Sequence, residues 1–127
     1  MADYFANSVP VDDGKCDFCG IISGRIQERT IRYQDDDLMV FKNALPWVPV
    51  MFLIVPKLHM KQGEFWKSPL FAQAAALAVK IGQEDSPDGF RLVSNFGEKA
   101  AQTQLHGHLH VLGGRRLGGL QRQAGGD

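Results

Sequence analysis

The stretch Leu105-His106-Gly107-His108-Leu109-His110-Val111-Leu112 places a histidine at every second position. Side chains alternate between the two faces of a β-strand, so a strand here projects all three imidazoles from one face. The other face then carries Leu105, Leu109 and Val111 and can be buried. The chain has only four histidines, and packing alone does not require three of them on one face. The spacing therefore predicts a site that uses positioned imidazoles.

The composition predicts one ordinary globular domain. The chain has 127 residues, of which 44% are hydrophobic and 22% charged, which is typical of soluble domains. Lys plus Arg and Asp plus Glu number 14 each, so the basic excess expected of a nucleic-acid-binding protein is missing. No apolar run reaches the roughly 20 residues that cross a bilayer, and the N-terminus lacks the apolar core of a secretory signal. We therefore expect a cytoplasmic protein with neither a nucleic acid nor a membrane as partner.

The order of predicted elements favours an α+β domain with a mainly antiparallel sheet. A short helix is expected over residues 16–22, and the three aspartates at 35–37 predict the turn of a hairpin between strands at 31–33 and 38–41. The apolar run 50–55 suits a strand buried on both faces. Ser68-Pro69 starts a long helix that Gly82 can end, and a turn at 86–89 precedes strands at 90–95 and 105–112. The polar loop 96–104 separates these last two strands.

The two cysteines leave three readings open. Cys16 and Cys19 form a Cys-x-x-Cys pair, which is half of a tetrahedral zinc site, a redox pair, or two buried thiols. A structural disulfide is disfavoured in a cytoplasmic protein. The Cys-x-x-Cys spacing alone does not distinguish these three interpretations.

Several of these motifs together resemble the histidine triad (HIT) family, and Leu109-His110-Val111-Leu112-Gly113-Gly114 resembles its Hint branch. The resemblance covers roughly residues 16–114 and includes the Cys-x-x-Cys pair, the run 52–59 and the loop 95–103. It implies a HIT-like fold, with a five-stranded sheet, one long and one short helix, and a homodimer whose sheets join. We accordingly expect a flexible arm at 1–14, a HIT domain at 15–114 and a flexible tail at 115–127.

The resemblance also implies a reaction at the α-phosphate of a purine nucleotide. His108, the middle histidine, would be the nucleophile that forms a covalent nucleotidyl-histidine, and a neutral imidazole is a capable nucleophile near pH 7. His110 would donate to phosphate oxygens as their charge builds. The family positions that contact the substrate are occupied in this chain by Asn43, Asn95, Gln102 and Thr103. Backbone N–H groups near Ala101 would add hydrogen-bond donors.

Many prokaryotic members of the family complete a zinc site with two histidines, and this chain has both. By that resemblance Cys16, Cys19, His59 and His106 would hold one structural zinc per chain. Four protein ligands leave no open position for a substrate, so this zinc would not be a catalytic cofactor.

Two positions depart from the Hint pattern. Asn43 stands where that branch usually has an aspartate on the ribose hydroxyls, and an amide lacks the charge that strengthens such a bond. Met51 stands where many members have a histidine, and we expect it to be a packed apolar side chain.

These observations favour a nucleoside phosphoramidate hydrolase. His110 favours hydrolysis, since transferases of the superfamily carry glutamine at that position. Alternatives are a dinucleoside polyphosphate hydrolase, a nucleotide-binding or interaction module with little turnover, and a zinc enzyme whose triad holds a catalytic metal.

Overall fold

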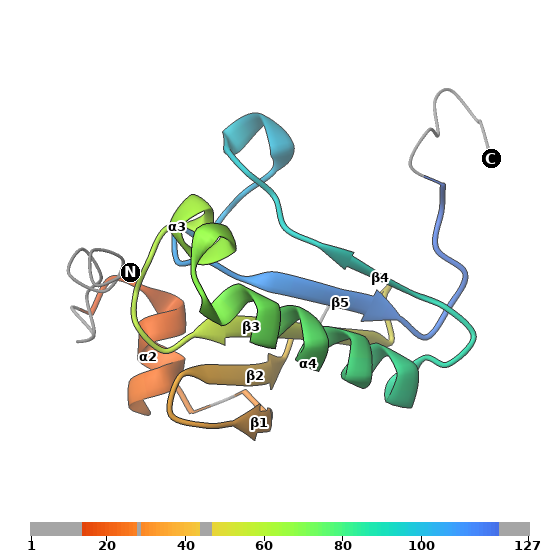
Figure 1. Ribbon diagram of the computed structural model, residues 1–127, viewed down its shortest axis with the longest axis horizontal. Coiled ribbons are helices and arrows are strands. Elements are labelled where there is room, and N and C mark those ends of the chain that lie inside the picture. Colours follow the sequence, from red (N-terminus) through yellow and green to blue (C-terminus); the bar gives the residue numbers. More distant parts are fainter. Residues whose placement is uncertain (1–13, 28, 44–46, 120–127) are drawn as a thin grey trace.

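The computed structural model describes residues 14–27, 29–43 and 47–119, and they form one five-stranded sheet of order β1-β2-β3-β5-β4 (Figure 1). All four ladders between neighbouring strands are antiparallel. The predicted α+β class and five-stranded antiparallel sheet are therefore confirmed. The strands are β1 (Ile31–Gln34), β2 (Leu38–Lys42), β3 (Val50–Pro56), β4 (Phe90–Val93) and β5 (Leu109–Gly113).

The described residues form three α-helices, whereas two were predicted. They are α2 (Asp17–Ser23), α3 (Gln62–Lys67) and α4 (Leu70–Asp85), and a 3-10 turn η1 (Glu98–Ala100) lies in the loop before β5. The sequence prediction missed α3, which has only six residues and contains a glycine. None of the helices in these ranges is both long enough and apolar enough to cross a membrane.

The turn between β1 and β2 lies at the three aspartates, as predicted, and the side chain of Asp35 supports it. The Oδ1 of Asp35 accepts from the N–H of Asp37 and from that of Leu38, both at 2.8 Å. The first of these bonds is the main reason why the pKa of Asp35 lies below its ordinary value. The Asp35 side chain therefore supplies an acceptor for two backbone N–H groups of the turn.

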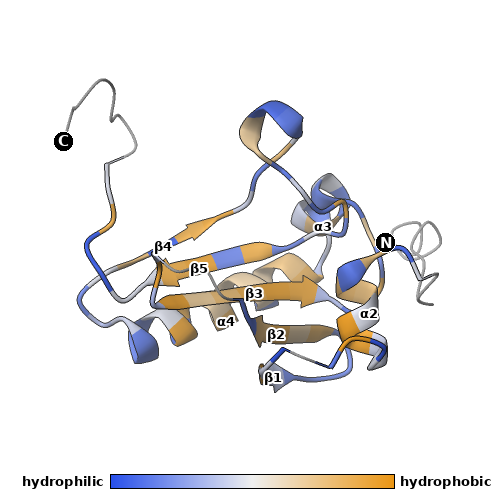
Figure 2. Cartoon of the chain, turned by 180° about the vertical axis from the view of Figure 1, so that it is seen from behind, coloured by the Kyte–Doolittle hydropathy of each residue, from blue (hydrophilic) through white to orange (hydrophobic). Residues whose placement is uncertain are grey.

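The sheet buries side chains on both of its faces. Helix α4 covers one face, and α2 covers one end of the other (Figures 1 and 2). Strand β3 supplies both cores: Phe52 and Ile54 pack under α4, while Met51, Leu53 and Val55 pack on the α2 side. This is the expected behaviour of a continuous apolar run in a central strand, and Met51 is the packed side chain that was expected.

Helix α4 begins as predicted but ends later. The Oγ of Ser68 accepts from the N–H of Leu70 at 2.8 Å, which caps the first turn. The prediction that the helix ends at Gly82 is wrong. A Cβ at Gly82 would come within 2.3 Å of the Phe90 ring, so the glycine serves close packing inside the helix. The helix ends at Asp85, and the N–H of its C-cap Ser86 bonds the Gly82 carbonyl.

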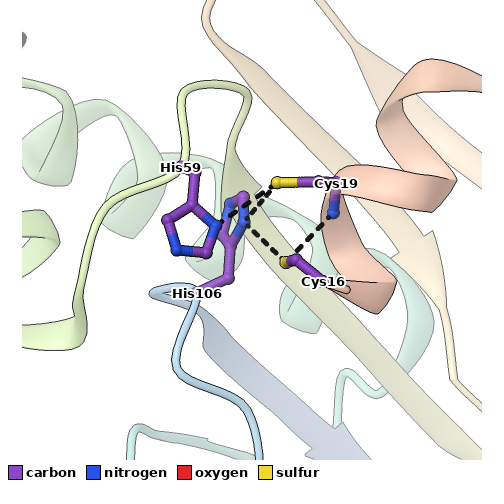
Figure 3. Close-up of side chains that lie close together, drawn as sticks. All are labelled: Cys16, Cys19, His59 and His106. Atoms are coloured by element: carbon purple, nitrogen blue, oxygen red, sulfur yellow. Dashed lines mark hydrogen bonds between the residues drawn. The ribbon is translucent and has the colours of Figure 1, made fainter. Parts of the chain in front are cut away.

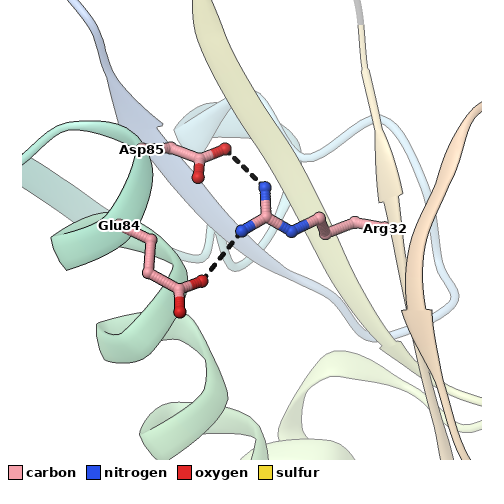
Figure 4. A network of polar contacts seen from close by, with 3 residues as sticks. All are labelled: Arg32, Glu84 and Asp85. Carbon is pink, nitrogen blue, oxygen red and sulfur yellow. Dashed lines mark hydrogen bonds and ion pairs between the residues drawn. The ribbon is translucent and has the colours of Figure 1, made fainter.

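An ion-pair bridge joins the edge strand β1 to the end of α4. The two terminal nitrogens of Arg32 contact Asp85 at 2.7 Å and Glu84 at 2.9 Å (Figure 4). The same guanidinium lies 5.4 Å from the centre of the Phe52 ring. The arm predicted at 1–14 and the tail predicted at 115–127 lie mostly outside the described residues, at 1–13 and 120–127, and stay predictions.

Candidate functional site

The histidine stretch is only partly a strand. Strand β5 begins at Leu109, so it contains His110, while His106 makes an isolated bridge to Lys61 before the strand. The N–H of Gly107 donates to the carbonyl of Met60 at 2.7 Å, which draws the chain toward the segment before α3. The prediction that Leu105 can be buried is wrong, since it is 72% exposed where the chain has left the sheet. Leu109 and Val111 are buried as predicted.

The hydrogen bonds of His108 fix its tautomer. Its Nδ1 lies 2.8 Å from the carbonyl oxygen of His106, and only a protonated Nδ1 can donate to a carbonyl. The other ring nitrogen, Nε2, therefore carries a lone pair. Among the described residues Nε2 has no hydrogen-bond partner, yet no buried side-chain nitrogen there lacks one. Nε2 is therefore not fully enclosed, although the residue as a whole is only 4% exposed.

Burial keeps the neighbouring imidazoles neutral. It lowers the pKa of His108, against the opposing effect of the bond to the His106 carbonyl. It also lowers the pKa of His110 to about 4, with a further contribution from His108. The rings of His108 and His110 lie 4.9 Å apart, centre to centre. Two neutral imidazoles thus stand side by side at the start of β5.

A phenylalanine between the two cysteines packs against His106 and His108. Phe18 meets the His108 ring edge-on at 5.1 Å and the His106 ring at 5.8 Å. It comes from α2, which Cys16 caps through a bond from the Cys19 N–H. The sequence analysis missed Phe18, because nothing in a Cys-x-x-Cys pair says which ring its middle residues contact.

The four predicted metal ligands converge. The ligand atoms of Cys16, Cys19, His59 and His106 all lie within 4.8 Å of one another (Figure 3). The Nδ1 of His106 lies 3.5 Å from each thiol sulfur, and the Nδ1 of His59 lies 3.3 Å from Cys19 Sγ. Helix α2 and its N-cap Cys16 supply the two sulfurs, while the two imidazoles come from the segments that follow β3 and precede β5.

This donor set fits a metal ion in both spacing and protonation. Ordinary zinc bond lengths and a tetrahedral angle put sulfur and nitrogen ligands about 3.5 Å apart. The Nε2 of His106 donates to the Pro56 carbonyl at 2.7 Å, so its Nδ1 presents a lone pair to the sulfurs. Burial lowers the pKa of His106 to about 4, which keeps the ring in the neutral form that metals require. The cluster can therefore hold a metal ion.

The predicted nucleoside-contacting residue Asn43 lies on the histidine face of the sheet. Its N–H bonds the Met51 carbonyl at 3.0 Å, one residue beyond β2. Phe41, Leu53 and His110 are cross-strand neighbours, so alternation puts Asn43 on the same face as His110. Strand spacing and rise separate the two by about 10 Å across the sheet and about 7 Å along it.

Two of the loop groups predicted to contact the phosphate make hydrogen bonds within the loop. The Gln102 amide is used within its own loop, accepting from the Gly97 N–H and donating to the Gln104 carbonyl, both at 2.8 Å. The Ala101 N–H, predicted as a phosphate donor, bonds the Glu98 carbonyl. Thr103 is exposed. Asn95, at the exit of β4, is linked to His108 through a residue that the sequence analysis missed, Gln62.

Comparison with known proteins assigns the family. The HIT domain family model matches residues 25–117. An uncharacterised HIT-like protein of Rickettsia prowazekii is 32% identical over 81% of this chain and 90% of its own length. A HIT family hydrolase from Legionella pneumophila is 34% identical, covering 80% of this chain and 95% of its own with a TM-score of 0.72. A HIT family hydrolase from Clostridium thermocellum is 31% identical, covering 85% and 97% with a TM-score of 0.75.

The family model spans most of the chain, and its match includes His59 and all three histidines of the stretch that precedes and enters β5. Sequence and fold therefore agree with the resemblance drawn from those histidines. The chain belongs to the HIT domain family.

Proposed function

We propose that the protein is a nucleotide hydrolase that acts at the α-phosphate of purine nucleoside phosphoramidates through a covalent nucleotidyl-histidine. One observation carries the proposal: His108 is held as the Nδ1–H tautomer, which leaves its Nε2 lone pair without a hydrogen-bond partner among the described residues. That is the state a nucleophilic imidazole needs. The HIT family hydrolases similar to this chain support the reaction class.

The first half of the reaction breaks the phosphoramidate bond. Nε2 of His108 forms a bond to the α-phosphorus while the P–N bond breaks and the amine leaves, taking a proton from solvent. The attacking ring becomes positively charged, and the carbonyl of His106 on Nδ1–H stabilises that charge. The neutral imidazole of His110, beside His108, donates a hydrogen bond to a non-bridging oxygen of the phosphate in the transition state.

The second half restores the enzyme. Water attacks the phosphorus of the nucleotidyl-histidine, the bond to Nε2 breaks, and the nucleoside monophosphate leaves after losing a proton to solvent. Asn43 is proposed to bind the ribose hydroxyls, and Asn95, Gln102 and Thr103 to contact the phosphate. For Gln102 to contact the phosphate, the loop before β5 must rearrange, because the Gln102 amide is hydrogen-bonded to Gly97 and Gln104 of the same loop.

The metal cluster has a structural role in this proposal. One zinc per chain on Cys16, Cys19, His59 and His106 would tie α2 to the sheet beside His108. A bound zinc supplies cross-linking of these segments, and its four protein ligands leave no place for substrate. The residues that do the chemistry are then His108 and His110.

The test combines turnover with trapping of the intermediate. Adenosine 5′-phosphoramidate should be hydrolysed to AMP, and mass spectrometry of quenched protein should find one adenylyl group on His108. His108→Ala should lose several orders of magnitude in turnover, as other enzymes do without their nucleophile. Its circular dichroism and zinc content should match those of wild type. Wild-type protein that binds AMP without hydrolysing the phosphoramidate would instead make this a nucleotide-binding module.

A further inference from the structure

Side chains, rather than neighbouring strands, hold the backbone of His108. The β3–β5 ladder ends at the pair Ile54 and Leu109, and the β4–β5 ladder ends at the pair Val93 and His110. His108 therefore lies just beyond the regular sheet. Its N–H donates to Gln62 Oε1 at 2.8 Å, and its carbonyl accepts from Ser94 Oγ at 2.6 Å.

Gln62 is placed so that both ends of its amide are used. It is 3% exposed in the first turn of α3, and its Nε2 donates to the Asn95 carbonyl at 3.1 Å. The His108 N–H demands an acceptor and the Asn95 carbonyl demands a donor, so only one orientation of the amide satisfies both. A buried amide that lost either partner would pay a desolvation penalty. Gln62 therefore fixes the distance between His108 and the exit of β4.

Ser94 holds the other side of the same residue. It follows β4 directly, and its hydroxyl donates to the His108 carbonyl just beyond the last pair of the β4–β5 ladder. Together with the bond from His108 Nδ1 to the His106 carbonyl, three hydrogen bonds of 2.6–2.8 Å converge on His108. They fix the backbone on both sides of the ring and the ring itself.

We propose that Gln62 and Ser94 are positioning residues that aim the Nε2 of His108 at the reacting phosphorus. The inference rests on the proposed function, because it assigns His108 the role of nucleophile. A misplacement of about 1 Å at a reacting atom can cost on the order of 100-fold in rate. Neither side chain needs to touch substrate for this effect, since both act through the His108 backbone.

The test removes each hydrogen bond: Met has nearly the volume of Gln, and Val at position 94 has the volume of Thr, which serves as its hydroxyl-bearing control. Gln62→Met and Ser94→Val should each lower kcat on adenosine 5′-phosphoramidate by about 10- to 100-fold, with KM within about threefold of wild type. Ser94→Thr keeps the hydroxyl and should restore most of kcat. If Gln62→Met does not fold, the Ser94 pair still decides the matter.

Ser86→Ala provides a matched control. Ser86 is a buried serine whose Oγ also bonds two backbone groups, the Gly89 carbonyl and the Gly114 N–H, but at the far end of β5. Its loss should lower the melting temperature and leave kcat within about twofold of wild type. A general loss of stability would instead lower kcat in all three variants alike.

A second readout does not depend on turnover. Nitrogen-15 NMR of the imidazoles should show His108 as a single Nδ1–H tautomer in wild type and as a mixture in Gln62→Met and Ser94→Val. Unchanged kcat and an unchanged tautomer in both variants would overturn the inference. If wild type shows no hydrolysis but the tautomer still shifts in the variants, the positioning stands and the proposed function falls.

Discussion

The backbone carbonyl of His106 accepts a hydrogen bond from the ring of His108, while the ring of His106 belongs to the metal cluster. The ring of His106 faces the thiols of Cys16 and Cys19, while its carbonyl accepts the Nδ1–H of His108 at 2.8 Å. The metal cluster and the proposed nucleophile are therefore separated by a single peptide segment. Anything that moves His106 moves the group that sets the His108 tautomer.

We predict one zinc per chain in protein purified without chelator, measured by elemental analysis. The double variant Cys16→Ser/Cys19→Ser should lose it and melt at a lower temperature, because α2 is no longer tied to the sheet. The variant should remain folded, since most of the α4-side core lies away from the cluster. Less than about a tenth of an equivalent in wild type, or full zinc retained in the double variant, would show that this site is wrong.

Local signals in the sequence predicted much of the fold. The turn at 35–37 was predictable because Asp35 bonds its own neighbours. Strand β3 was predictable because a continuous apolar run of that length is typical of a strand buried on both faces. Helix α3 was not predictable from periodicity. It is held by the Glu64 carboxylate on the Lys61 N–H and by burial of Phe65, and burial depends on the tertiary fold.

The site was predictable only where residue type carries the chemistry. The two thiols and four histidines of the chain predicted both the metal cluster and the pair of imidazoles at His108 and His110. Gln62 and Ser94 gave no such signal, because a glutamine in a short helix and a serine after a strand are usually solvated. Only the contacts to His108 show what they do.

We predict a homodimer formed through β4. This strand pairs only with β5, so its other edge offers unpaired N–H and C=O groups among the described residues. Proteins usually cover such an edge, and a second copy of the strand would do so. Light scattering should give twice the chain mass of 14.1 kDa. A monomer mass at micromolar concentration would contradict the prediction.

Acid should destabilise the fold partly through His110. Its pKa is about 4 in the folded chain, against about 6.5 when unfolded. The unfolded chain therefore binds more protons between these values, so the free energy of unfolding is constant above pH 6.5 and falls as the pH drops toward 4. The loss from this one group is on the order of 3 kcal/mol. Urea titrations at pH 7.5 and 5 measure the free energy of unfolding at each pH. From the higher to the lower pH it should fall less in His110→Gln than in wild type, and an equal fall in the two proteins would refute the assignment.

A side chain on the glycine between His106 and His108 should destabilise the fold. A Cβ at Gly107 would come within 2.7 Å of the Phe65 Cβ, so Gly107→Ala must push α3 away from the histidines. We expect it to lower the free energy of unfolding by about 1–3 kcal/mol, the usual cost of overpacking. Gly63→Ala, on α3 itself, is the matched control. Its added Cβ meets nothing within 4 Å, so the better helix propensity of alanine should leave stability unchanged or raise it by about 0.5–1 kcal/mol. Urea unfolding of the two variants checks both signs, and a Gly107→Ala protein as stable as wild type would show that α3 does not pack against the glycine as described.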